Sequence, residues 1–381
     1  MNATVYLDNN ATTPMLPEVA AAVVSSMQDC YGNPSSKHHV GDMAREALMR
    51  ARGKVAALLS AAPAEIVFTS GATESNHLAI LGALARDPAR RHLIVSAVEH
   101  PSIRLLLPRV QQMGVRVTNI PVNGQGMPDL DVLRLALTGE TALVSMMWVN
   151  NETGVVMPIA EVAALAADRG VPLHVDATQA VGRMPLDMRA CPADLLSFSG
   201  HKFHAPKGVG GLFVRKGFVL PALLGGRQER GRRGGTENVA ALVGMGVAAE
   251  LTTQHMQTRM QAMRDLRDRF ETMVTDRIGA AQVNGHGVAR IGNTSNVCFP
   301  GLNAETIIHR LDKAGICVSS GAACAASGTE ASHVLLAMGQ SEEMARSAIR
   351  VSFGVCNTEE EAILAAETLC DVVQPLLNRA A

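Results

Sequence analysis

The sequence has 381 residues, enough for two hydrophobic cores, and its 47% hydrophobic and 18% charged content excludes an intrinsically disordered chain. Its 34 Lys and Arg and 35 Asp and Glu leave a formal charge of -1, which excludes a general attraction for nucleic acid or anionic membranes. No basic, apolar leader or membrane-length apolar run is present, and none of the cysteines forms a Cys-x-x-Cys pair. We therefore expect a cytoplasmic protein with reduced thiols.

Short apolar runs alternate with longer helix-patterned stretches between about residues 65 and 215, as in the crossover units of a parallel sheet. Several runs are apolar throughout, which is typical of strands covered on both faces. The pattern predicts an α/β domain with strands over residues 65–69, 92–97, 142–149, 172–175, 194–198 and 210–214. Ligands of such sheets bind beyond the carboxyl ends of the strands, so we expect a site there.

The pattern changes near residue 256, where apolar residues recur with a helical period. These residues are Met256, Met260, Met263, Leu266, Phe270 and Met273. We expect this helix to bridge into a second domain, with its methionines packed in a core rather than forming a groove for a partner. Apolar segments at 296–300, 316–319 and 349–353, with helices between them, predict a smaller α+β domain.

Lys202 ends the sequence Ser-Gly-His-Lys at 199–202 and directly follows an expected strand, which delivers its amine to the ligand edge. Taken alone, such a residue is more simply a solvated surface lysine. A lysine near a cationic or apolar site can instead lose its proton and bond to an aldehyde cofactor. Asp176 favours this second interpretation, because its strand-end carboxylate suits a cationic ring nitrogen, although a strand-end Asp is as often a structural cap.

A phosphate group needs hydrogen-bond donors, and residues 70–73 (Ser-Gly-Ala-Thr) form a small-residue turn at the start of an expected helix. Gly and Thr at this place are also ordinary capping residues. Ser199 and His201 flank the candidate lysine and could donate to the same phosphate, as could the loop at 234–238. His100 ends another strand, where an imidazole can stack on a cofactor ring and move protons, although a lone histidine is more often structural.

Cys324 lies in a stretch of small residues bounded by Gly321 and Gly328. This composition predicts a mobile, accessible segment, which suits a nucleophile that must travel. A structural cysteine is usually buried among apolar neighbours instead. We therefore interpret Cys324 as a reactive thiol.

Together these segments resemble the cysteine desulfurases, in the NifS/IscS-like branch of the class-V aminotransferase (fold type I) group of pyridoxal-phosphate enzymes, over nearly the whole chain. The matching segments are 6–14 (Tyr-Leu-Asp-Asn-Asn-Ala-Thr-Thr-Pro), 32–36 (Gly-Asn-Pro-Ser-Ser), 68–75 (Phe-Thr-Ser-Gly-Ala-Thr-Glu-Ser), 149–154 (Val-Asn-Asn-Glu-Thr-Gly), 176–179 (Asp-Ala-Thr-Gln), 199–202 and 350–354 (Arg-Val-Ser-Phe-Gly). The resemblance implies a large cofactor-binding α/β domain over residues 15–255 with a mainly parallel seven-stranded sheet. A small α+β domain, from residues 1–14 and 256–381, would carry the mobile cysteine loop at about 319–332.

The same resemblance implies a role for each candidate residue. Lys202 would bond to pyridoxal 5′-phosphate, Asp176 would pair with its ring nitrogen, and His100 would stack on its ring. Residues near its phenolic oxygen would be Gln179 and Asn151, and residues that hold its phosphate would be Ala72, Thr73, Ser199, His201 and, from the neighbouring subunit of a homodimer, Thr236. Arg350 would bind the substrate carboxylate with help from Asn151. Cys324 would accept sulfur, although Ala322 and Ala325 replace hydroxyl residues of the family pattern around it.

We therefore expect an enzyme that converts L-cysteine to L-alanine, leaving a persulfide on Cys324 for an iron-sulfur scaffold or another sulfur-acceptor protein. No metal ion, nucleic acid or membrane is expected to take part. Residues 99–102 and 357–360 resemble the nitrogen-fixation type of the family more than the housekeeping type. The alternatives are a selenocysteine lyase or an aminotransferase on the same fold, and a non-catalytic scaffold of an iron-sulfur assembly complex. An aminotransferase needs no thiol, and a scaffold would have a damaged cofactor site.

Overall fold

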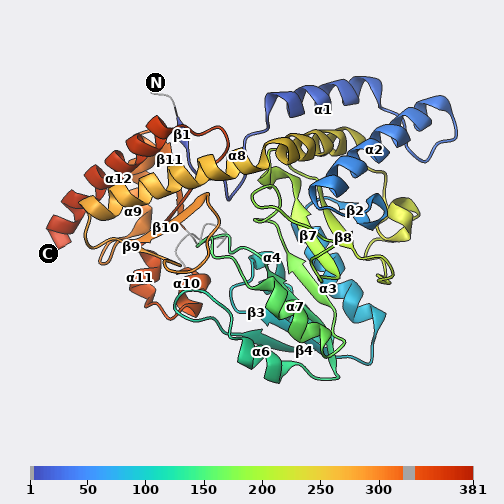
Figure 1. Ribbon diagram of the computed structural model, residues 1–381, viewed down its shortest axis with the longest axis horizontal. Coiled ribbons are helices and arrows are strands. Elements are labelled where there is room, and N and C mark those ends of the chain that lie inside the picture. Colours follow the sequence, from blue (N-terminus) through green and yellow to red (C-terminus); the bar gives the residue numbers. More distant parts are fainter. Residues whose placement is uncertain (1–3, 321–330, 381) are drawn as a thin grey trace.

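The computed structural model describes residues 4–320 and 331–380, and its largest feature is a seven-stranded sheet with the order β2-β8-β7-β6-β5-β3-β4 (Figure 1). Within this sheet β8 runs antiparallel to both of its neighbours, β2 and β7, and the pairs from β7 to β4 are parallel. The strands are β2 (Ile66–Thr69), β3 (His92–Ser96), β4 (Arg116–Ile120), β5 (Thr141–Met147), β6 (Leu173–Asp176), β7 (Leu195–Ser199) and β8 (Gly210–Val214). The expectation of a mainly parallel α/β sheet with seven strands is confirmed.

Each of the six strands expected from apolar runs is present, with its ends within two residues of the expected bounds. The seventh strand, β4, had not been expected. It lies at the edge of the sheet, and residues such as Arg116 and Asn119 in it are exposed. An edge strand with polar side chains has no continuous apolar run by which it could be recognised.

Helices cover both faces of the large sheet. Successive side chains of a strand point to opposite faces, so each strand can pack against both layers of helices. Ile66 and Phe68 of β2 belong to one hydrophobic core, whereas Val67 between them belongs to another. Helices that contribute to the first core are α2 (His39–Leu58), α7 (Ile159–Ala167) and α8 (Val239–Arg277), and helices that contribute to the second are α3 (Ala72–Arg86) and α5 (Leu107–Gln112). Both faces of the sheet are therefore covered by hydrophobic cores, which leaves its strand ends as places for a ligand.

A smaller sheet of four strands, in the order β12-β13-β10-β9, has a separate hydrophobic core. Its strands are β9 (Gln282–Val283), β10 (Thr294–Cys298), β12 (Ser319–Ser320) and β13 (Ala348–Ser352). The helices that pack on it are α9 (Ala304–Lys313) and α12 (Glu359–Ala380). Beside it, β1 (Val5–Tyr6) pairs in parallel with β11 (Ile316–Cys317), so the start of the described chain lies with the second half of the sequence.

The helix α8 is continuous over 39 residues and runs from the large sheet to the small one in Figure 1. Met245 belongs to the core of the large sheet and Phe270 to the core of the small one. Met263 of the expected stripe is buried, and Leu266 and Met273 pack on the second core. The stripe is therefore a packing surface, as expected. The division of the chain at residue 256 into two domains stays a prediction.

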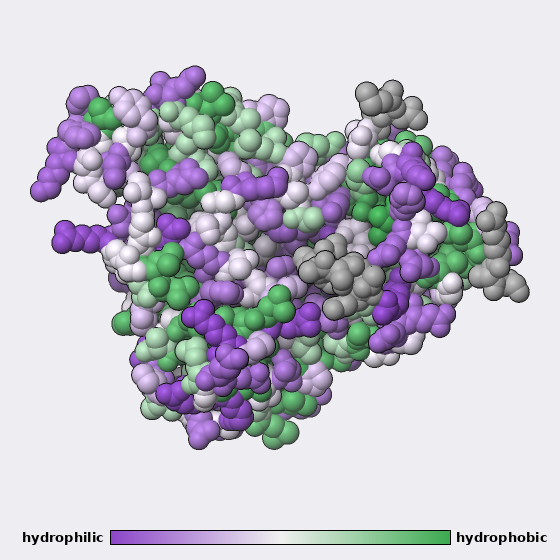
Figure 2. Space-filling model, turned by 180° about the vertical axis from the view of Figure 1, so that it is seen from behind, coloured by the Kyte–Doolittle hydropathy of each residue, from purple (hydrophilic) through white to green (hydrophobic). Residues whose placement is uncertain are grey.

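The remaining helices are short or lie at the periphery. They are α1 (Pro17–Asp29), α4 (Pro101–Arg104), α6 (Leu130–Ala136), α10 (His333–Ala337) and α11 (Glu342–Arg346). Polar and apolar side chains are interspersed over the face of the molecule that Figure 2 shows. In the described part of the chain, no helix combines the length and the apolar character needed to cross a membrane.

Candidate active site

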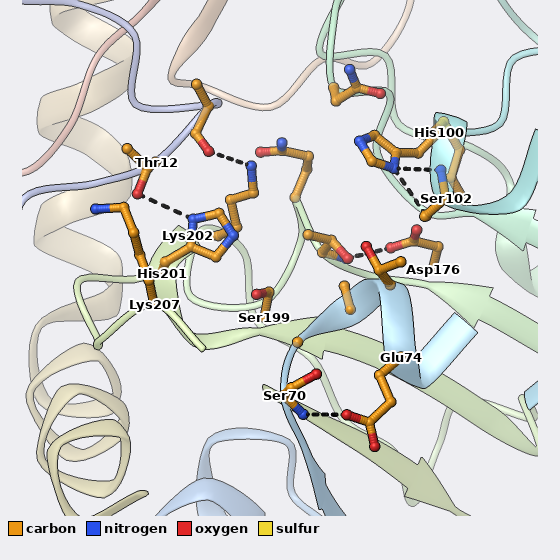
Figure 3. A pocket seen from close by; sticks show the side chains of 18 of the residues that line it. Thr12, Ser70, Glu74, His100, Ser102, Asp176, Ser199, His201, Lys202 and Lys207 are labelled. Carbon is orange, nitrogen blue, oxygen red and sulfur yellow. Dashed lines mark hydrogen bonds between the residues drawn. The ribbon is translucent and has the colours of Figure 1, made fainter. Parts of the chain in front are cut away.

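A cavity of about 490 Å³ opens at the carboxyl ends of the parallel strands, where the sequence predicted a ligand site (Figure 3). The sequence-predicted residues that line it are Ala72, Thr73, His100, Asn151, Asp176, Gln179, Ser199, His201 and Lys202. They come from segments that span more than a hundred residues of sequence. The fold therefore gathers into one cavity most of the residues that had been singled out one by one.

Lys202 reaches the cavity from a single 3-10 turn, Gly200–Lys202, that directly follows β7. Its Nζ atom donates hydrogen bonds to the carbonyl oxygens of Asn10 at 2.5 Å and Ala11 at 2.8 Å. The amine therefore lies between the end of the large sheet and the N-terminal segment of the described chain. Figure 3 shows its side chain directed into the cavity.

Asp176 is the last residue of β6 and is 4% exposed. Its Oδ2 atom accepts a hydrogen bond from Asn76 Nδ2 at 2.7 Å, and its Oδ1 atom accepts from Thr178 Oγ1 at 2.5 Å and from Thr178 N at 3.0 Å. Both carboxylate oxygens are therefore held in place. A buried carboxylate that lines a cavity in this way offers a fixed negative charge to a cationic ligand group.

His100 caps the N-terminus of α4, and its Nδ1 atom accepts a hydrogen bond from Ser102 N at 3.1 Å. Burial lowers the pKa of His100 below its ordinary value, and the nearby carboxylate of Asp176 opposes this effect. The ring is therefore neutral at pH 7, and because Nδ1 accepts, the proton lies on Nε2. His100 can present this N–H group as a donor in the cavity.

The N-terminus of α3 lies at the cavity and could hold an anion there, because the first N–H groups of a helix have no partner within the helix. A Cβ atom on Gly210 would lie 2.6 Å from the Phe198 carbonyl oxygen and 2.7 Å from the Gly71 Cα atom. Glycine at 210 therefore lets β8 approach the turn before α3. This approach sets the helix start beside the end of β7, where Ser199 also lines the cavity.

His201 also lines the cavity, and its Nδ1 atom is 3.1 Å from Thr12 Oγ1. Burial lowers the pKa of His201 to about 4, and the charge of Lys202 adds to the effect. A neutral imidazole with one nitrogen paired has its other nitrogen available for a ligand. The side chain therefore suits hydrogen bonding to an anion rather than charge pairing with it.

Two of the described sequence-predicted residues do not line the cavity. Arg350 lies in the middle of β13 behind the cavity wall, where its Nη1 atom donates to the Asn151 carbonyl oxygen at 3.1 Å. Thr236 is exposed, in the segment between residues 231 and 239, and does not line the cavity of its own chain. Cys324 lies outside the described residues.

Other residues at the cavity were missed from the sequence. They are Ala11, Thr12, Glu74, Ser102, Met147, Val149, Thr178, Lys207 and Gly208. Several lie within or next to the segments that carried the family resemblance, for example Thr12 in residues 6–14 and Thr178 in residues 176–179. Their position near a recognised motif could have identified them as site residues. Their residue types alone gave no reason to assign them a role. Across residues 4–320 and 331–380, no cluster of His, Cys, Asp and Glu has the arrangement of a metal site.

Comparison with known proteins agrees with this geometry. Residues 5–363 match the Aminotransferase class-V family. A cysteine desulfurase from Trichormus azollae is 46% identical over 373 residues, covering 98% of this chain and 93% of the relative. The solved structure of a NifS-like protein, 33% identical, superposes with a TM-score of 0.91 and covers 97% of this chain and 99% of the other.

A further solved relative, SspA in complex with cysteine, is 34% identical with a TM-score of 0.83 and covers 93% of this chain and all (100%) of the other. Similarity of this extent includes both sheets and the segments that form the cavity. It is too extensive to reflect a shared architecture alone. The chain therefore belongs to the Aminotransferase class-V family and, within it, is an enzyme of the cysteine desulfurase type.

Proposed function

We propose that this chain removes sulfur from L-cysteine, with pyridoxal 5′-phosphate bound to Lys202, to release L-alanine and leave a persulfide on Cys324. The observation that carries the proposal is the convergence of a lysine amine, a strand-end carboxylate and a helix N-terminus on one cavity. The relatives named cysteine desulfurases, and the relative solved in complex with cysteine, support the choice of substrate.

The donor set fits this cofactor group by group. The Lys202 amine suits its aldehyde, the Asp176 carboxylate suits its ring nitrogen, and the His100 imidazole suits the face of its ring. Its phosphate would be held at the start of α3 by Ala72, Thr73, Ser199 and His201, and its phenolic oxygen would lie near Gln179 and Asn151. When bound, the cofactor supplies an electron sink for the charge left on the substrate α-carbon.

Lys202 and His100 are the proposed proton carriers. The amine of Lys202 takes the proton from the substrate α-carbon, and the carbonyl oxygens of Asn10 and Ala11 stand ready to accept from the ammonium that results. His100 holds a proton on Nε2, since its Nδ1 atom accepts from the backbone of Ser102. That proton is available where sulfur leaves the substrate.

Arg350 and Asn151 are the proposed substrate-binding residues, with the guanidinium recognising the α-carboxylate. The Cys324 thiolate then attacks the substrate sulfur. A sulfur–sulfur bond forms while the bond between sulfur and the substrate β-carbon breaks. A proton takes the place of sulfur on that carbon, so that L-alanine is the product and Cys324 carries the persulfide.

The working enzyme in this proposal is a cytoplasmic homodimer, in which Thr236 of each subunit reaches the phosphate held by the other. Two observations support the dimer: Thr236 is exposed in its own chain, and α1 and α2 carry exposed apolar residues, including Val24, Met27 and Met49. Persulfide sulfur would pass to an iron-sulfur scaffold or another acceptor protein, including one of the nitrogen-fixation type. Residues 1–14 and 256–381 would form the small domain that carries Cys324.

The test of the sulfur-accepting role is a Cys324→Ala variant. It should keep the visible absorption band of the bound cofactor but lose release of L-alanine from L-cysteine by at least about a hundredfold, because covalent capture of sulfur is absent. Cys356→Ala is the matched control, since Cys356 is exposed among the described cysteines and has no proposed role. Unchanged turnover of the Cys324 variant would remove this thiol from the mechanism.

The test of the cofactor site is Lys202→Ala. This variant should lose the visible band of the bound cofactor, and its L-alanine release should fall by at least about a thousandfold, because the variant lacks both the covalent attachment and the proposed base. Absorption spectra of the purified protein, incubated with pyridoxal 5′-phosphate and then desalted, provide the measurement. A variant that retains the wild-type spectrum would contradict the assignment of Lys202.

A further inference from the structure

The segment at residues 6–14 carried part of the family resemblance, yet no side chain in it has a role in the reaction proposed above. In the structure this segment crosses from the small sheet to the cavity. Its residue 8 forms an isolated parallel bridge with Ser352, at the end of β13. Asp8 is therefore placed beside the strand that carries Arg350.

The backbone of this segment is fixed by hydrogen bonds on both sides of Asp8. Ser352 N donates to the Leu7 carbonyl oxygen at 2.7 Å, and Asn9 N donates to the Ser352 carbonyl oxygen at 3.2 Å. A Cβ atom on Gly354 would lie 2.4 Å from Asn9 Oδ1, so the segment also packs closely against the residues that follow β13. The position of the Asp8 side chain is therefore set by the register of its backbone.

From this position the Asp8 carboxylate meets the guanidinium of Arg350. Asp8 Oδ1 accepts a hydrogen bond from Arg350 Nη2 at 2.7 Å, and the two side chains are 22% and 5% exposed, respectively. A buried guanidinium without a counter-ion is costly, and an ion pair of this geometry satisfies it. On the other side, Nη1 donates to the carbonyl oxygen of Asn151, which lines the cavity.

The remaining guanidinium nitrogen of Arg350, Nε, is buried and has no hydrogen-bond partner within the described part of the chain. Buried polar groups are rarely left unpaired, so this N–H group still calls for a hydrogen-bond acceptor. Asp8 and Asn151 thus orient the guanidinium without using up its capacity to bind an anion.

We propose that Asp8 is a positioning residue that holds Arg350 in the orientation that recognises the substrate α-carboxylate. The inference rests on the proposed role of Arg350 in the preceding subsection. Asp8 acts through the arginine and does not touch the substrate. Its loss should therefore weaken recognition of the carboxylate and leave the later chemical steps unchanged.

The test is Asp8→Asn in the full-length enzyme loaded with pyridoxal 5′-phosphate, compared with Arg350→Ala. Asp8→Asn should raise the KM for L-cysteine about tenfold with kcat within about twofold, as expected for weakening one charge-assisted hydrogen bond. Binding of L-alanine, followed through the visible absorption band, should weaken by a similar factor. Binding of cysteamine, which has an amine and a thiol but no carboxylate, should not change.

Two further variants separate positioning from folding. Asp8→Glu keeps the charge and should restore part of the affinity for L-cysteine, and it serves as the readout if Asp8→Asn does not fold. Glu271→Gln disrupts another buried ion pair near the small sheet, in which Glu271 and Arg290 are 2.7 Å apart. This control should lower the midpoint of thermal unfolding and leave the KM for L-cysteine unchanged.

The outcomes distinguish a failure of the inference about Asp8 from a failure of the proposed role of Arg350. One outcome is that Arg350→Ala weakens the binding of L-cysteine but not that of cysteamine, while Asp8→Asn leaves the KM for L-cysteine unchanged or lowers it. In that case Asp8 does not position the arginine, and only the present inference fails. If Arg350→Ala leaves the preference for L-cysteine over cysteamine unchanged, the proposed role of Arg350 fails and the role of Asp8 fails with it.

Discussion

The two sheets contribute to the cavity in different ways. The large sheet contributes residues at or just beyond strand ends, such as Asp176 and Lys202, which point into the open space. The small sheet holds Arg350 behind the cavity wall, in the middle of β13, where backbone pairing with both neighbouring strands fixes it. The proposed cofactor groups therefore lie where side chains can vary without disturbing a sheet. The proposed substrate-recognition group is instead part of a sheet and depends on its neighbours for orientation.

The largest effect expected from this difference concerns Arg52, which supports the large sheet beside the turn at residues 70–73. Its guanidinium pairs with the buried Glu229 at 2.6 and 2.7 Å, and Glu229 also accepts from Phe68 N in β2 at 2.9 Å. Arg52→Met leaves a buried carboxylate uncompensated and should lower the free energy of unfolding by about 3–5 kcal/mol. Because β2 leads into the turn at 70–73, cofactor binding should weaken as well. Urea unfolding and cofactor retention after dialysis measure the two effects.

The control for Arg52→Met is again Glu271→Gln, at a buried ion pair near the small sheet. This variant should be less stable than the wild type but should retain its cofactor. Equal loss of cofactor from both variants would show that the site depends on global stability, and the contrast between the two sheets would then be lost.

The second prediction concerns Glu152, which lies where the two sheets meet. Its Oε2 atom accepts from Ser332 Oγ at 2.5 Å, and its carbonyl oxygen accepts from Asn296 Nδ2 at 3.3 Å. Burial raises the pKa of Glu152 to about 7, although the hydrogen bond from Ser332 opposes this effect. The folded protein therefore holds a proton that the unfolded chain releases near pH 4.5.

The stabilisation from this proton is complete below about pH 4.5 and is lost as the pH rises through about 7. Glu152→Gln should remove this dependence. Relative to the variant, the wild type should lose up to roughly 3 kcal/mol of unfolding free energy between about pH 5 and 8. Urea unfolding of both proteins across this range tests the prediction, since subtracting one curve from the other cancels the contribution of the buried histidines. Parallel curves would mean that Glu152 is already ionised in the folded protein.

The smallest effect is expected for Thr12, which supports His201 from the N-terminal segment. Thr12→Val removes the hydroxyl that lies 3.1 Å from His201 Nδ1 and should weaken binding of pyridoxal 5′-phosphate about fivefold, the size of one ordinary hydrogen bond. Thr253→Val is the matched control, because the Thr253 hydroxyl bonds only to a carbonyl within α8. Absorption titration of the apoenzyme gives the dissociation constants. Equal affinities for both variants would contradict a supporting role for Thr12.

The sequence was most informative where function and local pattern coincide. Asp176 and Lys202 follow apolar strands, and parallel strands place their carboxyl ends at one edge, so their convergence could be predicted. The strand β4 could not, because its polar edge position gives no apolar run. The contact of Asp8 with Arg350 could not either, since it joins residues 342 positions apart and depends on how the segment around Asp8 pairs with β13.

That separation also has a consequence for how the protein is made. A chain is synthesised from its N-terminus, and Asp8 therefore emerges long before Arg350. A nascent chain that has passed β8 already contains Asp176 and Lys202, whereas the ion pair of Asp8 must wait for β13. The segment around Asp8 is among the first to leave the ribosome, but it can pair with β13 only after nearly the whole chain has been made. The proposed ability to bind substrate would therefore arise only when synthesis is nearly complete.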